Sequence, residues 1–412
     1  MRFSLAIFAM LIILSACGSP ASAPAASHQF TVTNNTPIDR MDELVRLDAE
    51  QLASKFGIAD WQKAVFTIGD QAVPFEYFAG TGKEAAAKVG LLLSTSAGES
   101  KAITLRPLSA TEAAPVFPKR TQAEISHKTG GYWEEREYKE GTFKNVDHLS
   151  VPPEHTDHSW FIRYEGPGWE SDLVGYRFYL DWRNATDIFG KKTRDMVLQQ
   201  VGQDGFDSYH EPADWGQDVL KVGKSLGVGA LGAWLGDHAL RVEETDSLDC
   251  VILNNGTIES TVRTTYHGWT VADKKTDLTV DLSIHAGSRL TKSEVRLSEP
   301  LDNLCTGLGK QENGELLHVQ KGKWASLATW GKQSLADDHL GMAVIYRKED
   351  LRTVTEDGFS HVVVLNPKAG ELTYYFLAAW EQEPGGIKNR AAFVTYLENT
   401  LLKLNEPLTV DF

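Results

Sequence analysis

The sequence predicts an all-β protein built mainly from antiparallel strands, with one helix near its C-terminal end. Short segments in which apolar and polar residues alternate recur along the chain, and this alternation is typical of half-buried strands. Turns marked by glycine and proline separate many of these segments. The chain also has no strand–helix–strand rhythm, no GxGxxG motif and no P-loop motif. Together these observations favour packed antiparallel sheets over a parallel α/β fold.

The N-terminus has the pattern of an exported bacterial lipoprotein. Arg2 supplies a positive charge, residues 5–14 form an uncharged apolar run too short to span a bilayer, and Cys17 follows small residues. We therefore predict a signal peptide over residues 1–16, lipid on Cys17 and a tether over residues 17–27. The alternative is an ordinary secretory leader cut after a small residue. The lipoprotein interpretation places the protein in the cell envelope, periplasmic or attached to the outer membrane, and touching the membrane through its lipid anchor only.

Residues 28–110 are expected to form a small antiparallel β-sandwich. Its strand candidates are residues 29–34, 43–47, 64–68, 72–78, 89–93 and 102–105. Gly69 and Asp70 lie between two of them and predict a hairpin turn. Residues 111–122 contain Pro115 and Pro118 and predict a linker.

Residues 123–412 are expected to form a larger β domain. Its strand candidates are residues 258–266, 278–284, 290–297, 342–346, 361–365 and 372–380. The clearest helix covers residues 388–404, because Phe393, Leu397 and Leu401 share one face with Tyr396 and Thr400. Pro407 ends this helix, and residues 408–412 predict one more strand.

Composition restricts the class of partner. The formal net charge of −15 argues against binding to nucleic acid. An acidic substrate would need a locally basic pocket within this negative protein.

Cys250 and Cys305 predict either a disulfide in an oxidising compartment or two buried free thiols, since neither lies in a Cys-x-x-Cys motif.

Charged, aromatic and glycine residues are concentrated in two segments, residues 153–183 and residues 209–232. Aromatic rings stack on the C–H faces of sugars, while Asp, Glu, Arg and His side chains bind hydroxyls and carboxylates. The two segments therefore predict a carbohydrate site. The alternative is that they are edge strands with ordinary surface charges and core aromatic residues.

Residues in both segments carry a family resemblance. Trp169, Glu170, Ser171 and Asp172 are followed by Tyr176 and Arg177; further along come Tyr209, His210, Gly216, Asp218 and Lys221. This pattern resembles the family called domain of unknown function 4861, over most of the chain. The sequence departs from the family pattern at four positions: His155, Ser171, Gly175 and Leu180.

The resemblance implies a fold and an activity. It implies a galactose-mutarotase-like β-supersandwich as the larger domain. It also implies a role in polysaccharide breakdown, since at least one member dehydrates the terminal uronic acid of an oligosaccharide to a 4,5-unsaturated sugar. On this basis the predicted activity is that of a carbon–oxygen lyase acting on an acidic oligosaccharide.

Such a β-elimination needs a base for the C5 proton, a cation or hydrogen bonds for the carboxylate, and an acid for the departing hydroxyl. We expect Arg177 to bind the carboxylate, with a structural ion pair to Glu170 or Asp172 as its alternative. His210 is the leading base or acid, its alternative being a histidine at a loop edge. Tyr209 or Tyr164 would donate a proton, Lys221 would neutralise the uronate or act as base, and Asp218 would orient His210 or Lys221. The side chains expected to bind substrate are Trp169, Glu170, Asp172, Tyr164, Trp215 and His158.

No cofactor is predicted, although a divalent metal such as Ca²⁺ or Zn²⁺ stays open. Its candidate ligands are His155, Asp157, His158, His210, Glu211 and Asp214, in no specific metal motif.

Three other functions also stay open. They are a non-catalytic glycan-binding lipoprotein, a sugar epimerase or mutarotase, and a glycoside hydrolase in which Glu170 and Asp218 face each other across a cleft.

Overall fold

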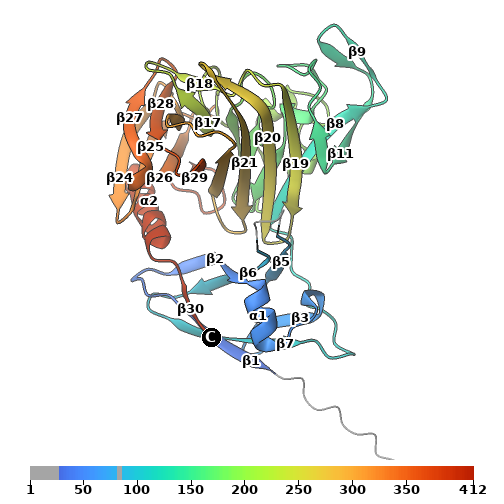
Figure 1. Cartoon of the computed structure of the whole chain (residues 1–412), viewed down its shortest axis with the longest axis vertical. Helices are drawn as coiled ribbons and strands as arrows, with labels where there is room; N and C mark the ends of the chain where they lie inside the picture. The colour runs from blue at the N-terminus through green and yellow to red at the C-terminus, as the bar shows by residue number, and fades with distance from the viewer. Residues whose placement is uncertain (1–26, 81–85) are drawn as a thin grey trace, which may run out of the picture.

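The computed structural model describes residues 27–80 and 86–412, and it shows a mainly antiparallel β protein with several sheets and two α-helices (Figure 1). Every pair of strands within this part of the chain is antiparallel, as the sequence predicts. The predicted signal peptide, Cys17 and nearly all of the predicted tether lie outside the described residues. None of the helices in the described ranges has the length and apolar character needed to cross a membrane.

The N-terminal unit packs two sheets against each other. The first has the order β30 (Thr409–Asp411), β1 (His28–Thr33), β7 (Ser100–Pro107), β3 (Ala64–Ile68) and β4 (Gln71–Ala72). The second has the order β2 (Arg40–Asp48), β6 (Lys88–Thr95) and β5 (Phe75–Phe78). Phe30, Phe66 and Leu91 lie in the core between them. The hairpin predicted at Gly69 and Asp70 joins β3 to β4.

Helix α1 (Ala49–Phe56) was not expected among these strands. The Asp48 side chain accepts a hydrogen bond from the Gln51 backbone N–H, which caps the first turn. Gly57 ends the helix in the left-handed conformation, at φ 68°. Leu52 and Phe56 bury one side of the helix in the core of the N-terminal unit.

The larger unit is organised on a nine-stranded sheet. Its order is β12 (His148–Ser150), β19 (Ser247–Asn255), β20 (Glu259–Val271), β21 (Lys274–His285), β22 (Leu290–Leu297), β29 (Glu371–Trp380), β26 (His339–Arg347), β25 (Trp324–Lys332) and β24 (Gly314–Lys321). Five strands of this sheet overlap strand candidates from the sequence: β20, β21, β22, β26 and β29. The sixth candidate, residues 361–365, falls in β28 (Ser360–Leu365) of the next sheet.

Two further sheets pack with it. The five-stranded sheet has the order β18 (Ala239–Arg241), β17 (Val228–Trp234), β23 (Leu304–Gly309), β28 (Ser360–Leu365) and β27 (Leu351–Glu356). The six-stranded sheet has the order β11 (Thr142–Val146), β8 (Thr121–Thr129), β13 (Gly168–Ser171), β14 (Val174–Phe178), β15 (Thr186–Lys191) and β16 (Gly216–Asp218). A hairpin of β9 (Tyr132–Glu134) and β10 (Glu137–Lys139) projects beside them (Figure 1). One apolar cluster runs through all three sheets, with Trp169, Tyr266 and Phe376 among its members.

The predicted C-terminal helix is confirmed as α2 (Arg390–Asn405). Asn389 caps its N-terminus by accepting from the Ala392 backbone N–H. Phe393, Leu397 and Leu401 pack against the end of the nine-stranded sheet formed by β24, β25 and β26. The chain then crosses to the N-terminal unit, where β30 pairs with β1. The last strand therefore lies in the N-terminal sheet, although the boundary expected from the sequence grouped it with the larger domain.

Cys250 in β19 and Cys305 in β23 are both buried and not bonded to each other. Burial raises the pKa of each thiol, so both stay protonated at neutral pH. Of the two alternatives for these cysteines, the structure has the free thiols.

Candidate active site

The two segments rich in charged and aromatic residues meet beside the six-stranded sheet. Strand register brings the central charges together, because Arg177 of β14 lies directly opposite Asp187 of β15. Asp218 of β16 lies opposite Phe189 in the same sheet. A cavity of roughly 210 Å³ opens here. Its lining includes all five residues expected to be catalytic, and also His158.

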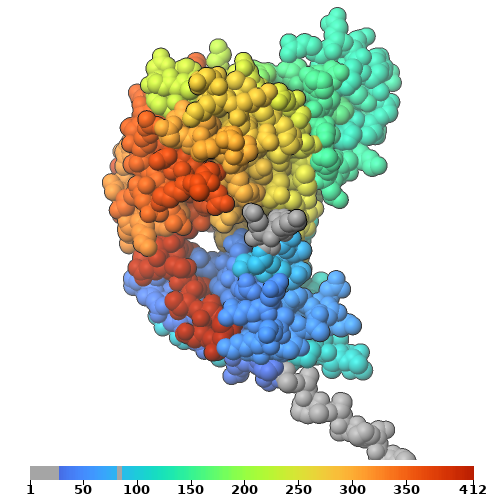
Figure 2. Space-filling model, in the orientation of Figure 1, coloured from blue at the N-terminus to red at the C-terminus, as the bar shows by residue number. Residues whose placement is uncertain are grey.

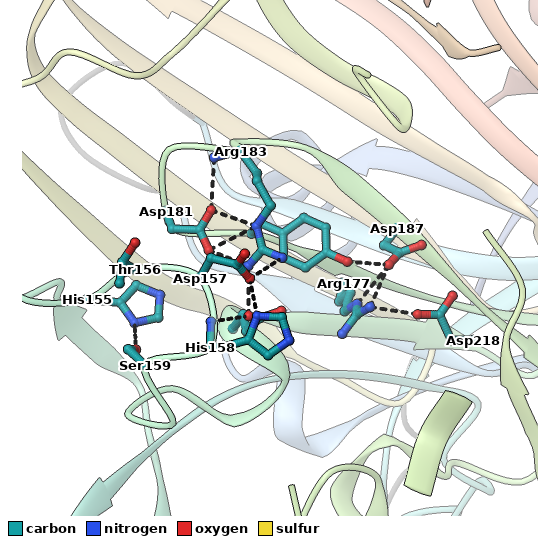
Figure 3. Close-up of polar contacts among 12 residues, drawn as sticks. His155, Thr156, Asp157, His158, Ser159, Arg177, Asp181, Arg183, Asp187 and Asp218 are labelled. Atoms are coloured by element: carbon teal, nitrogen blue, oxygen red, sulfur yellow. Dashed lines mark hydrogen bonds and ion pairs between the residues drawn. The ribbon is translucent and has the colours of Figure 1, made fainter. Parts of the chain in front are cut away.

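Arg177 is the buried centre of this site, with 2% of its surface exposed. Its guanidinium donates to Asp187 Oδ2 from Nε at 3.0 Å and from Nη2 at 2.6 Å. It also donates to Asp218 Oδ2 at 2.6 Å (Figure 3). A further hydrogen bond runs from its Nη1 to the Tyr209 hydroxyl at 2.8 Å. These four hydrogen bonds leave one of its five N–H groups, so Arg177 has little capacity left for a substrate carboxylate. Its ion pairs are structural, which was the alternative considered from the sequence. Its partners, however, are Asp187 and Asp218 and not Glu170 or Asp172.

Asp187 is one of the two carboxylates that pair with the Arg177 guanidinium. Burial and the neighbouring Asp218 carboxylate together raise the pKa of Asp187 to about 6, against the opposing effect of Arg177. The Tyr179 hydroxyl donates to the same Asp187 oxygen at 2.6 Å. The Arg177 guanidinium lies 4.8 Å from the centres of both the Tyr179 and the Tyr209 rings. One cation is thus held by two carboxylates and two aromatic faces.

His210 lies at the mouth of the cavity, at the end of the short helix η4 (Ser208–His210). Its Nδ1 is 3.3 Å from Asp218 Oδ2, and 45% of its side chain is exposed. A proton on Nδ1 is favoured by this carboxylate, which leaves Nε2 as the nitrogen able to accept a proton. The arrangement is that of a His–Asp pair in which Asp218 is itself fixed by Arg177.

Tyr209 is buried beside His210 and is one of the residues that line the cavity. The hydroxyl accepts from Arg177, so its own hydrogen is free to be donated elsewhere. Burial raises the pKa of Tyr209, which keeps the group protonated. It can therefore act as a proton donor.

Lys221 follows β16 and is exposed at the edge of the cavity. It forms no ion pair with any residue in the described part of the chain, whereas Arg177 and Arg183 are both paired. The backbone carbonyl of Lys221 accepts from Gln311 at 3.0 Å, which fixes the loop. Lys221 is thus the lining cation best able to meet an anionic ligand.

Arg183 forms a second charged cluster beside the first. It contacts Asp181, pairs with Glu165 at 2.8 Å and pairs with Asp157 at 2.9 Å (Figure 3). Burial acts to raise the pKa of Glu165, but Arg183 and then Arg177 outweigh it and lower the pKa to about 2. Glu165 is therefore ionised at all ordinary pH values.

Asp157, His158 and Glu165 offer three ligand atoms within 4.8 Å of one another, which is close enough to share a metal ion. Arg183 already neutralises both carboxylates of this cluster. His155, another candidate ligand, is buried and hydrogen-bonded to Ser159 at 2.8 Å. The donors are therefore better matched to a guanidinium than to a divalent ion.

The backbone around this cluster is strained. His158, Trp160, Tyr164 and Glu165 all adopt left-handed conformations, with φ values of 57°, 62°, 38° and 69°. Each such residue costs about 1–3 kcal/mol, and such strain tends to concentrate at functional sites. The Glu165 carboxylate holds the segment by accepting from the His158 backbone N–H at 2.9 Å.

Five residues expected to bind substrate lie outside this cavity. Trp169 has no exposed surface; its indole N–H donates to Thr291 and its ring stacks on Tyr176. Glu170 is equally buried, where it pairs with Lys191 at 2.6 Å. Neither can reach a sugar, so both are corrected to core residues. The pair of carboxylates considered for a glycoside hydrolase, Glu170 and Asp218, does not line a common cavity.

The other three are also held by protein groups. Asp172 pairs with Arg120 at 2.7 Å and accepts from the Gly287 backbone N–H. The Tyr164 hydroxyl donates to Glu124 at 2.7 Å, so it is not a proton donor to the cavity. Trp215 is half-buried with its ring 5.9 Å from that of Phe189.

The structure adds four lining residues with polar side chains that were not singled out: Glu165, Tyr179, Arg183 and Asp187. Three of them lie within the first polar segment of the sequence. Asp187 lies beyond it, and only the hairpin register that pairs it with Arg177 identifies it.

Comparison with known proteins supplies a family. The model of the family described as "Domain of unknown function (DUF4861)" matches residues 32–410. No curated protein matches the sequence of this chain.

Two solved structures from Enterococcus faecalis are distantly similar. One is a protein in glycosyl hydrolase family 38, with 10% identity, a TM-score of 0.44 and 93% of this chain covered. The other is an alpha-mannosidase from strain V583, with 10% identity, a TM-score of 0.43 and 93% covered. This chain spans 47% and 46% of their lengths, about half in each case.

Proposed function

This chain belongs to the family described as domain of unknown function DUF4861, and on that premise we propose that it is a carbohydrate-active lyase. Its proposed reaction removes water from the terminal uronic acid of an oligosaccharide and leaves a 4,5-unsaturated sugar. The observation that carries the proposal is the meeting of His210, Tyr209 and Lys221 in one cavity around the buried Arg177.

The three side chains match the three needs of the reaction. Lys221 binds the substrate carboxylate, which makes the C5 proton more acidic and accepts charge as that proton leaves. His210 Nε2 takes the C5 proton, with Asp218 stabilising the imidazolium that forms. Tyr209 donates its proton to the 4-hydroxyl. The C5–H and C4–O bonds break, the C4–C5 double bond forms, and the released hydroxyl leaves as water.

Arg177 does not bind the substrate carboxylate in this scheme, although its residue type first favoured that role. Its hydrogen bonds hold Asp218 and the Tyr209 hydroxyl in place. Arg177 is therefore a positioning residue, and Lys221 takes over the binding of the carboxylate. A positive Arg177 beside Tyr209 also stabilises the phenolate left after proton donation.

The setting proposed for this activity follows from the sequence pattern of residues 1–17. We propose that the enzyme works in the cell envelope, tethered through lipid on Cys17, on acidic oligosaccharides released from a polysaccharide.

The test is the ultraviolet absorbance of the conjugated product. The purified protein is mixed with oligosaccharides that end in a saturated glucuronic, iduronic or galacturonic acid. The proposal predicts a rise in absorbance with at least one of them, abolished by His210→Ala and retained by His238→Ala. His238 is a matched control, because its Nδ1 lies 2.7 Å from Asp237 on the exposed surface. No rise with any oligosaccharide, together with binding by calorimetry, would favour a glycan-binding protein instead.

A further inference from the structure

A second and larger cavity lies between the N-terminal unit and the nine-stranded sheet. Its volume is roughly 500 Å³, which is within the usual size of a small-molecule site. Figure 2 shows the hollow between the blue N-terminal unit and the red and orange C-terminal part of the chain. It shares no lining residue with the cavity around Arg177.

The walls of this junction cavity are positively charged. Six cationic side chains line it, against two carboxylates, Glu43 and Glu259. The six are Arg40, Arg46, Arg289, Lys292, Arg347 and Lys403. The chain as a whole carries a net charge of −15, so the charge of this cavity is opposite in sign to that of the whole protein. A cavity of one sign within low-dielectric walls attracts ions of the opposite sign.

Several of these cations have a structural explanation. Arg46 contacts Glu259 and Lys403 pairs with Glu43, and both pairs tie the N-terminal unit to the larger one. Arg289 is neutralised by the buried Glu383. These groups shape the walls without needing a ligand.

Lys292 and Arg347 are not explained by ion pairs between the two units or with a buried carboxylate. Among residues 27–80 and 86–412, Lys292 forms its one ion pair with Glu294 of its own strand. Arg347 lies 3.6 Å from Glu349, two residues along the chain. Neither pair joins the two units. The side chains are 29% and 49% exposed, so both retain N–H groups for a ligand.

Aromatic rings lie next to these cations. The Arg347 guanidinium is 5.2 Å from the Trp324 ring centre, and Trp324 packs edge-on against Tyr375 at 5.5 Å. Tyr396 of α2 lies on the Arg289 side of the same cavity. Trp324 itself is buried, so the rings that can meet a ligand are those of the half-buried Tyr375 and Tyr396. Aromatic faces beside cations bind the apolar faces and the acidic groups of a charged sugar at the same time.

The cavity is also held in shape. Arg120 bridges Asp42 of the N-terminal unit and Asp172 at 2.8 and 2.7 Å. Gly287 has a φ of 72°, and a Cβ at this position would lie 2.4 Å from Asp42 Cβ, so the two units approach closely there. Rigid walls lower the entropic cost of binding a ligand.

We propose that the junction cavity is a second, non-catalytic binding site for an anionic oligosaccharide, whose acidic groups contact Lys292 and Arg347. The proposal goes beyond the lyase activity and does not depend on it. Its benefit to catalysis, unlike the binding itself, rests on the proposed function: a polyanionic chain would be held on the enzyme while its terminal residue reacts in the cavity around Arg177.

The test is titration calorimetry of the purified Lys221→Ala protein with a short oligogalacturonate, since this background removes the free cation of the first cavity. We expect binding that weakens at high salt. Adding Lys292→Ala and Arg347→Ala is expected to weaken it about ten-fold or more, because charge-assisted hydrogen bonds are lost. Adding Lys348→Ala, the exposed neighbour of Arg347, is expected to leave the affinity unchanged. The same oligosaccharide with its carboxyls reduced to alcohols should not bind.

Two results would overturn the proposal: no binding to the Lys221→Ala protein, or unchanged affinity after both junction cations are removed. Thermal unfolding controls for misfolding, and Lys292→Arg with Arg347→Lys should retain binding because the charges remain. Failure of the lyase assay is a separate result, because this titration requires no turnover.

Discussion

Residues 169–172 and residues 209–221 have similar compositions and different places in the fold. Both combine tryptophan or tyrosine with carboxylates. The first segment lies in and just after β13, at the centre of the six-stranded sheet, where Trp169 and Glu170 have no exposed surface. The second lies at the edge of the same sheet, where its loops leave His210 and Lys221 in contact with solvent. The position of a strand in its sheet, more than its residue types, thus decides which polar residues are available to a ligand.

The largest expected effect is on catalytic activity, and it distinguishes residues 209–221 from residues 169–172. Removing a positioned acid or base costs about 10²–10⁴-fold in rate. His210→Ala is therefore expected to reduce kcat by about that factor while leaving the unfolding midpoint nearly unchanged, because the partly exposed His210 side chain contributes little to the core. Initial rates and urea unfolding on the same preparation check this, with His238→Ala as control. A His210→Ala protein of normal activity would remove His210 from the mechanism.

The next largest effect is on the free energy of unfolding, and it distinguishes residues 169–172 from residues 209–221. Lys191→Met leaves Glu170 buried without its ion pair, and breaking such a pair costs about 3–5 kcal/mol. The expected result is a much less stable protein whose folded fraction keeps its activity. Urea unfolding measures the loss, and rates per folded molecule measure the activity. If activity per folded molecule fell with stability unchanged, Glu170 would belong to the site after all.

A smaller effect is expected at the edge of the cavity. Lys221→Ala should raise KM for the acidic oligosaccharide by about ten-fold or more, because a charge-assisted contact of about 1.5–3 kcal/mol is lost. Lys221→Arg should restore much of this affinity. Lys274→Ala, at an exposed lysine on β21, is the matched control. An unchanged KM would show that another group binds the carboxylate.

The buried carboxylates also predict a pH dependence of stability. Burial, with the neighbouring Asp218, raises the pKa of Asp187 from 3.8 to about 6, so the folded state holds this proton more tightly than the unfolded state. The resulting stabilisation is fully present below about pH 4 and is lost as the pH rises towards 6. Urea unfolding at several pH values in this window should give a free energy with a more negative pH slope for the wild type than for Asp187→Asn. Equal slopes would mean that Asp187 keeps an ordinary pKa.

The smallest expected effect is that of a chelator. Arg183 already neutralises the carboxylates of Asp157 and Glu165, so we expect EDTA to leave the rate of elimination unchanged. A loss of rate that is restored by one divalent ion would place a metal among Asp157, His158 and Glu165.

Much of the fold could be predicted because strands bury residues with a period of two. The predicted strands at 64–68 and 290–297 match β3 and β22, and the helix at 388–404 differs from α2 by two residues at its start and one at its end. Helix α1 was missed because its eight residues follow a clear strand without a break. The Asp48 and Gln51 cap and Gly57 were the available signals. The pairing of β30 with β1 is a long-range contact that no local pattern encodes.

The site was predictable in part for the same reason. The sequence grouped Tyr209, His210, Asp218 and Lys221 because they are close along the chain. It could not separate Trp169 and Glu170 from them, because burial depends on sheet order. Nor could it find Asp187, whose proximity to Arg177 depends on hairpin register.

The most direct test of the central claim is the mass spectrum of the product formed from an oligosaccharide with a saturated terminal uronate. The account predicts the loss of one water and no released sugar, with wild type and Lys274→Ala alike, and no change of mass with His210→Ala. Release of a monosaccharide, or an unchanged mass with the wild type on every acidic oligosaccharide, would contradict elimination at this cavity.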